Sequence, residues 1–180
     1  MSCKNRNTKM IELHENGLDI QFRIRENGVV ELADFSSQEV KKAVMEPKED
    51  ICYPAVEIHR SGTGSLNMHA YKNNINQSSV DFVYENHELK AQDGGKELEI
   101  VMVSPEKLKA VYHMRLFDEV PAVQTWTEII NEGSEDQGLT YVSSFMYQGI
   151  SRGGKKPYYK KTDIYVPFNS WCCEAQWQKY

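Results

Sequence analysis

Hydrophobic and polar residues alternate with a period of two along most of the chain. In the clearest case, residues 18–25, four hydrophobic residues alternate with four polar ones: Leu18, Ile20, Phe22 and Ile24 against Asp19, Gln21, Arg23 and Arg25. Because successive side chains of a β-strand point to opposite faces, this alternation predicts a strand with one buried face. The dipeptide Asn27-Gly28, which is favoured in tight hairpin turns, follows at once, so residues 29–35 are predicted to return as the next strand.

The same pattern predicts strands at residues 9–14, 55–60, 66–70, 80–90, 97–104, 108–116, 122–131, 139–150, 163–166 and at the end of the chain. Turn residues separate these segments, among them Asp93-Gly94-Gly95, the proline turn Ser104–Lys107 and the acidic loop 132–138. Only residues 36–45 have helical spacing, with Ser36 or Ser37 available as an N-cap. Short strands with turns between them predict a single all-β domain over residues 1–180, an antiparallel β-sandwich, with a barrel as the alternative architecture.

Composition and charge narrow the partners that can be expected. The 180 residues carry a formal net charge of −5, which does not favour phosphate or anionic lipid surfaces. The first nine residues are polar and basic with no apolar run behind them, so we expect a cytoplasmic protein. No stretch approaches the roughly 20 apolar residues that a transmembrane helix needs, so no membrane partner is expected. The four cysteines are therefore expected to be reduced thiols, with the adjacent pair on opposite faces of a strand: Cys3, Cys52, Cys172 and Cys173.

The known motifs for metal and catalytic chemistry are absent from the sequence. The five histidines are scattered, and no HExxH, CxxC or EF-hand spacing is present: His14, His59, His69, His87 and His113. Neighbouring carboxylates such as Asp118-Glu119 and Glu135-Asp136 fall in predicted turns and point apart. We therefore predict no metal site, no cofactor and no catalytic residue within the chain.

A basic segment raises one alternative function. Lys155–Lys161 interleaves two tyrosines with four lysines, a pattern that suits stacking on single-stranded nucleic acid. The acidic total and the lack of a second basic patch argue against this interpretation. A nucleic-acid or protein interaction domain is therefore the third hypothesis, and no nucleic-acid partner is expected.

Three tryptophans lie beside carboxylate and amide residues, as a sugar surface requires. The candidates for carbohydrate binding are Trp126, Trp171, Glu174 and Trp177. If the last segment is extended, Trp171, Cys173, Ala175 and Trp177 share one face, and Cys172, Glu174 and Gln176 share the other. That arrangement separates the rings from the polar groups and favours tryptophans buried in a sandwich core as the alternative.

Two separated segments, in this order along the chain, resemble the N-terminal domain of family 36 glycoside hydrolases, the bacterial retaining α-galactosidases. The first is the run 118–133, with Trp126-x-x-Ile129-x-Asn131-x-Gly133 inside it, followed by a strand with Ser143-Ser144-Phe145. The second is Asn169-Ser170-Trp171-x-x-Glu174-x-Gln176-Trp177. Phe168 stands where the family has histidine, so a polar role at that position is not carried over. The resemblance covers the chain from about Ala55 onward.

This resemblance implies a fold and a role. The fold would be the first part of a galactose-mutarotase-like supersandwich, and the catalytic aspartates would lie in a (β/α)8 barrel that follows it. The leading hypothesis is thus a non-catalytic sandwich domain of an enzyme that hydrolyses terminal α-galactosides such as melibiose and raffinose. The second hypothesis is a free-standing carbohydrate-binding module. The partners implied are the downstream barrel and α-galactoside sugars. Because a sandwich cut midway would leave edge strands and an apolar face uncovered, we also expect a second copy of the chain in a two-fold dimer.

Overall fold

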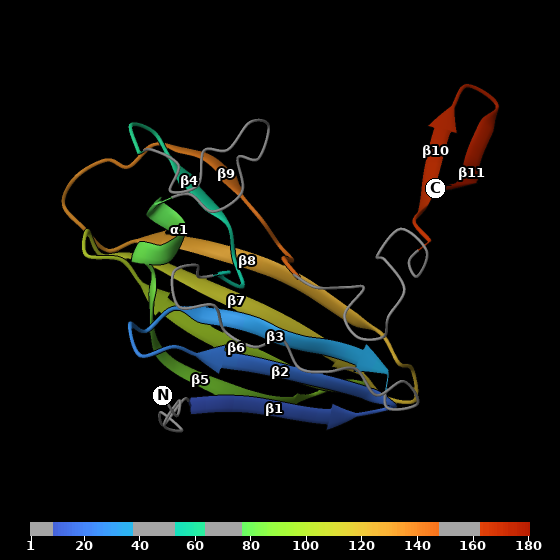
Figure 1. Ribbon diagram of the computed structural model, residues 1–180, viewed down its shortest axis with the longest axis horizontal. Coiled ribbons are helices and arrows are strands. Elements are labelled where there is room, and N and C mark those ends of the chain that lie inside the picture. The colour runs from blue at the N-terminus through green and yellow to red at the C-terminus, as the bar shows by residue number, and fades with distance from the viewer. Residues whose placement is uncertain (1–8, 38–52, 64–76, 148–162) are drawn as a thin grey trace, which may run out of the picture. The chain divides into compact units, whose positions relative to one another are not determined.

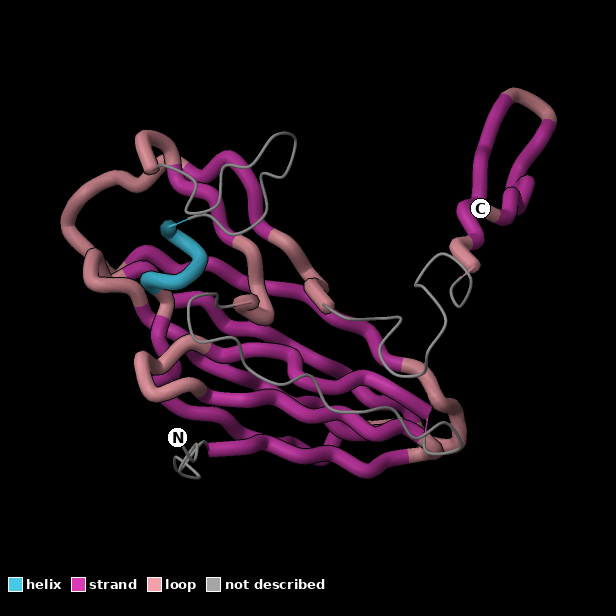
Figure 2. The backbone as a smooth tube through the Cα atoms, in the orientation of Figure 1, coloured by secondary structure: helices cyan, strands magenta, loops and turns pink. Residues whose placement is uncertain are grey.

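The computed structural model describes residues 9–37, 53–63, 77–147 and 163–180 of the chain. The chain divides into two compact units, Met1–Gln148 and Gly149–Tyr180, and each is described by itself. Strands dominate the described residues, and α1 (Gln77–Asp81) is their one short helix (Figure 2). No helix among these residues has the length and apolar character needed to cross a membrane.

Two antiparallel sheets form the layers of the first unit (Figure 1). One sheet has the order β1-β2-β3 and contains β1 (Lys9–Glu15), β2 (Leu18–Ile24) and β3 (Val30–Ser37). The other has the order β5-β6-β7-β8 and contains β5 (Val83–Gln92), β6 (Gly95–Val103), β7 (Leu108–Phe117) and β8 (Val123–Asn131). A short pair, β4 (Ile58–Arg60) with β9 (Leu139–Val142), completes the unit.

The hydrophobic core lies between the two main sheets and is built from their alternating residues. Ile20 and Phe22 of β2 are fully buried, as are Ile100 of β6 and Met114 of β7. The rings of Phe22 and Tyr112 meet edge to face, with 5.7 Å between their centroids. Burial raises the pKa of the Tyr112 hydroxyl well above its ordinary value. The predicted antiparallel β-sandwich is therefore confirmed for the described residues.

Most predicted strands and turns of the first unit are found in the structure. The Gly28 amide donates to the Arg25 carbonyl at 2.8 Å, and Gly28 has a φ of 85°, so it provides the left-handed residue of the β2–β3 turn. The predicted proline turn is closed by the Lys107 amide, which donates to the Ser104 carbonyl at 3.0 Å. Asp93-Gly94 connects β5 to β6, as expected.

Some local predictions were wrong. Ser36 and Ser37 are the last residues of strand β3, and Ser36 pairs with Asp19 in the ladder with β2, so no helix begins at Ser36. Val80 belongs to α1, where Ser78 and Ser79 are buried against the β4 backbone. Strand β4 covers only the last three of the residues predicted as 55–60. The predicted helical segment 36–45 lies outside the described residues from residue 38 onward, as do the predicted strand 66–70 and the basic segment Lys155–Lys161.

The second unit contains one hairpin, β10 (Tyr165–Ser170) with β11 (Cys173–Lys179). Trp171 and Cys172 form its turn, so Cys172 is not on a strand as predicted, and both adjacent cysteines are free and exposed. The register shifts between Phe168 and Ser170, and Ala175 has a φ of 51°. This bulge changes the alternation along β11. Trp177 pairs with Pro167, whereas Cys173 pairs with Ser170. Trp177 and Cys173 therefore lie on opposite faces of the hairpin and not on one face as predicted.

Candidate functional site

The outer face of the four-stranded sheet brings together a histidine, a tryptophan and three carboxylates. Pairing in the sheet places Glu99 opposite His113 and His113 opposite Trp126. Glu97 and Glu128 lie two residues from Glu99 and Trp126 along their own strands, so all five share this face. We call Glu97, Glu99, His113, Trp126 and Glu128 the outer-face cluster.

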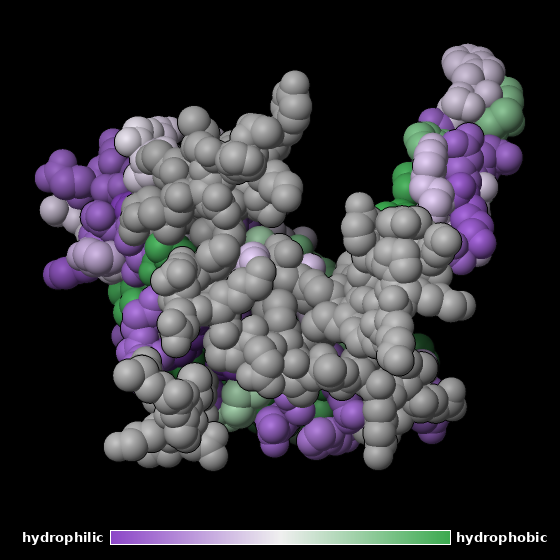
Figure 3. Space-filling view, in the orientation of Figure 1, coloured by the Kyte–Doolittle hydropathy of each residue, from purple (hydrophilic) through white to green (hydrophobic). Residues whose placement is uncertain are grey.

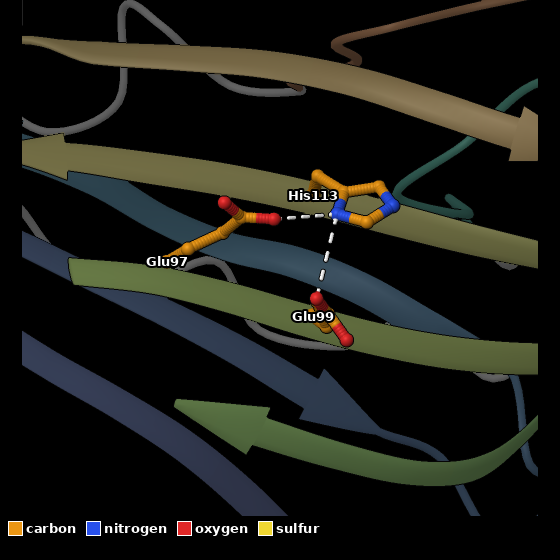
Figure 4. A group of neighbouring side chains, drawn as sticks. All are labelled: Glu97, Glu99 and His113. Atoms are coloured by element: carbon orange, nitrogen blue, oxygen red, sulfur yellow. Dashed lines mark hydrogen bonds and ion pairs between the residues drawn. The ribbon is translucent and has the colours of Figure 1, made fainter. Parts of the chain in front are cut away.

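His113 is the centre of the outer-face cluster (Figure 4). Its Nδ1 lies 2.8 Å from Oε1 of Glu97 and 4.0 Å from Oε1 of Glu99, while its Nε2 lies 3.8 Å from Oε2 of Glu128. The imidazole stacks on the Trp126 ring with 4.6 Å between centroids and 5° between planes. Its side chain is 9% exposed, and Nε2 is buried without a hydrogen-bond partner among the described residues.

Each carboxylate on β6 is held from its far side by a residue of β5. Gln92 donates to Oε2 of Glu97 at 2.5 Å, and Lys90 donates to Oε2 of Glu99 at 2.5 Å. The hydrogen bond to Glu99 raises the pKa of Lys90 above its ordinary value. The other oxygen of each carboxylate, Oε1, is thereby left facing the imidazole of His113.

The structure places the four predicted carbohydrate-binding residues in two different units. Trp126 is half-buried in the outer-face cluster on β8. Trp171, Glu174 and Trp177 are exposed in the hairpin of the second unit, with Trp171 at 93% and Trp177 at 64%. The alternative of tryptophans buried in a sandwich core is therefore wrong for Trp171 and Trp177. Sugar binding by any of the four stays a prediction.

Sequence reasoning missed His113, Glu97 and Glu99 because the scattered histidines match no motif. A signal was nevertheless available in the turn Ser104–Lys107. A hairpin that turns there pairs residues whose numbers have a constant sum, which brings residue 99 opposite residue 113. The predicted turn and the alternation on its two strands were together sufficient to place these side chains on one face.

The last residue of β8 and the turn that follows it, at one end of the same sheet, contain Asn131 and Gly133 of the segment 118–133. Asn131 accepts a bond from the Gly133 amide at 3.0 Å and donates to the Glu135 carbonyl at 3.0 Å. A Cβ on Gly133 would lie 2.6 Å from the Glu106 carbonyl oxygen, so glycine permits the close approach of the two turns. Asn131 and Gly133 therefore shape the backbone.

An open pocket between these two turns is lined by three acidic residues, and two of them, Glu106 and Glu132, have cationic partners. Glu106 lies 2.7 Å from Arg60, and Glu132 lies 2.6 Å from Lys109. Partial burial would raise the pKa of Glu106, but hydrogen bonds from its own amide, Arg60 and Ser104 hold it below the ordinary value. Hydrophilic side chains gather over this end of the unit, at the left of Figure 3. We assign the pocket no ligand.

Comparisons with known proteins identify similar solved structures. No protein-family model matches the chain, and no curated protein matches it. Two similar structures are crystal structures of the family 36 α-galactosidase AgaA from Geobacillus stearothermophilus. A doubly substituted variant in complex with raffinose has a TM-score of 0.46 and 11% identity, with 69% of this chain and 22% of that chain covered. The enzyme without these substitutions has a TM-score of 0.45 and 13% identity, with 71% of this chain and 23% of that chain covered.

The chain thus covers less than a quarter of the α-galactosidase to which it is similar. The enzyme named in these matches is a member of the family that the two sequence segments resemble.

Proposed function

We propose that the chain is a non-catalytic β-sandwich domain of an α-galactosidase-like glycoside hydrolase, whose catalytic barrel lies elsewhere in the parent protein. The observation that carries the proposal is that one asparagine in each of the two segments that resemble the family hydrogen-bonds to the backbone. Asn131 organises the turn after β8, and Asn169 accepts a hydrogen bond at 2.6 Å from the Ala175 amide in the bulge of the hairpin. Both asparagines serve the backbone, as expected for residues that define a domain and not a reaction.

The carboxylates of the outer-face cluster also fit a non-catalytic role. Retaining and inverting glycosidases place two carboxyl groups on either side of the scissile bond, about 5–9.5 Å apart. Glu97 and Glu99 project instead from one face of the same strand (Figure 4). Each also accepts a hydrogen bond from a residue of β5. This arrangement differs from two carboxyl groups that face each other across a sugar ring, and it supports a non-catalytic role.

Two measurements test the proposed function. The purified chain should not turn over aryl α-galactosides. Turnover that disappears in the Glu97→Gln, Glu99→Gln double variant would place catalysis in this chain and overturn the proposal. Reading the gene beyond Tyr180 is the second test. A frame that continues into a barrel with paired aspartates supports the proposal, and a stop codon there contradicts it.

A free-standing carbohydrate-binding module is the second candidate function, favoured by the exposed rings of Trp171 and Trp177. Tryptophan fluorescence during titration with galactose, melibiose and raffinose tests it. Binding should weaken in Trp171→Ala and Trp177→Ala but not in Tyr180→Ala, which changes another exposed ring of the same unit. An unchanged signal at millimolar sugar argues against the module. A cytoplasmic location, α-galactoside sugars as partners and assembly as a homo-oligomer stay predictions.

A further inference from the structure

We propose that Glu97, Glu99 and His113 form a binding site for a divalent transition-metal cation of the Zn²⁺ class. The protein ligands would be Nδ1 of His113 and Oε1 of each glutamate. This inference does not depend on the proposed function, because its readout is metal binding and not turnover.

The spacing of the three ligand atoms is the first argument. They all lie within 4.8 Å of one another, with Nδ1 of His113 2.8 Å from Glu97 and 4.0 Å from Glu99. Two ligands of a tetrahedral zinc ion, each bound at about 2.0–2.2 Å, are roughly 3.3–3.5 Å apart. Adjustments of about 1 Å in the side chains would therefore satisfy the coordination geometry. Imidazole and carboxylate are both ligands of this class of cation, and a fourth position would remain for water.

The rigidity of the site is the second argument. Glu97 and Glu99 lie on β6 and His113 on β7, the two central strands of the sheet. The side chains of Glu97 and His113 are only 8% and 9% exposed, so binding would order them little further. A preorganised ligand set loses less conformational entropy when the cation arrives.

The unsatisfied nitrogen of His113 is the third argument. Nε2 is buried without a hydrogen-bond partner among the described residues, and Oε2 of Glu128 lies 3.8 Å away. A metal on Nδ1 fixes the remaining proton on Nε2, which can then donate to Glu128. Histidines that bind metals commonly donate their second N–H to a carboxylate in this way, which orients the ring and raises its basicity.

Lys90 opposes the cation and provides the sharpest test. Its ammonium lies 2.5 Å from Oε2 of Glu99, so it contributes positive charge close to the ligand set while it leaves Oε1 open. Lys90→Ala should therefore tighten metal binding, by roughly threefold to tenfold. Unfolding of a variant cannot imitate a gain in affinity. Lys109→Ala is the matched control, because it removes an equal charge from the same sheet where the partner is Glu132.

The experiment is a titration of the chelator-treated full chain with ZnCl₂ by calorimetry, and with Co²⁺ followed by visible absorption. The exposed thiols Cys172 and Cys173 could bind the same ions, so all variants are made in a background with serine at both positions. We expect one equivalent to bind in this background. Affinity should fall at least about tenfold in His113→Gln, Glu97→Gln and Glu99→Gln, and less in Glu128→Gln. Glu132→Gln, a carboxylate of the same unit that is ion-paired to Lys109 and not to the ligand set, should change it little.

Each remaining outcome overturns the proposal. Binding that disappears when the two cysteines are replaced would assign the metal to the hairpin thiols. Equal affinity in His113→Gln and in the parent would exclude the imidazole as a ligand. Absence of binding at millimolar Zn²⁺ would show that the three side chains form only an ion-paired network. Folding of every variant is checked by circular dichroism.

Discussion

Glu31 is a carboxylate with 1% exposure inside the three-stranded sheet. It lies 3.5 Å from Arg23 and 3.1 Å from Arg25, and it accepts a hydrogen bond from the Tyr53 amide at 2.9 Å. Glu31→Gln removes the negative charge that neutralises the guanidinium groups of Arg23 and Arg25 in a region shielded from water. We expect a loss of about 3 kcal/mol in the free energy of unfolding, measured by urea denaturation. Asp163→Asn breaks an ion pair with Lys179 that is 55% exposed on both sides, so it should leave the free energy of unfolding nearly unchanged.

Two histidines should titrate on opposite sides of the ordinary pKa of 6.5. The hydrogen bond with Asp19 raises the pKa of His14, so its stabilisation is present at low pH and is lost as the pH rises through the folded value. Burial, with Lys9 nearby, lowers the pKa of His87, so its neutral form is favoured and stability falls as the pH drops below 6.5. Proton NMR of both imidazoles measures these shifts. Asp19→Asn should lower the His14 pKa without changing His87; an unchanged His14 would contradict the assignment.

At the scale of elements, the turn between β5 and β6 allows a matched comparison of two adjacent glycines. A Cβ on Gly95, whose φ is 158°, would lie 1.9 Å from the Leu116 carbonyl oxygen of β7. Gly94 has a φ of 71° and nothing within 4 Å of such a Cβ. Gly94→Ala should therefore cost about 1 kcal/mol from backbone strain alone, and Gly95→Ala at least about 3 kcal/mol because the β6–β7 ladder must move. Equal losses in urea denaturation would contradict this account.

The elements also show why part of the fold was predictable from sequence. The alternation of β2, β6 and β7 and the turns at Gly28 and Ser104–Lys107 are local, and the structure contains them as predicted. Three features depend on specific contacts that the alternation does not reveal, and they were missed. Ser78 and Ser79 hold α1 against β4, Ser36 joins the ladder with β2, and Ala175 takes a left-handed conformation supported by Asn169. The outer-face cluster is an intermediate case. The strands that contain it can be predicted from the local alternation of residues, but the pairing of these strands depends on the position of one turn.

At the scale of the whole molecule, the hydrophobic core lies in the first unit, and most of the exposed aromatic residues among the described ones lie in the second. The described core cluster draws its buried residues from positions 11–116, all in the first unit. The second unit, a hairpin, instead exposes large hydrophobic side chains: Ile164, Tyr165, Phe168, Trp171, Trp177 and Tyr180. An isolated two-stranded hairpin is only marginally stable in water. Stability should therefore reside in the first unit, and association in the second.

A truncation at residue 148 separates these two properties. We expect residues 1–148 to unfold in one cooperative transition, with a urea midpoint close to that of the full chain, because no residue of the described core cluster is removed.

The full chain should be a dimer by size-exclusion chromatography with light scattering, and the truncated chain a monomer. Trp171→Ser with Trp177→Ser in the full chain is the control, and it should weaken the dimer without changing the midpoint. A full chain that stays monomeric across dilution would contradict the predicted association, whereas a truncated chain that has lost its transition would show that the hairpin belongs to the cooperative fold.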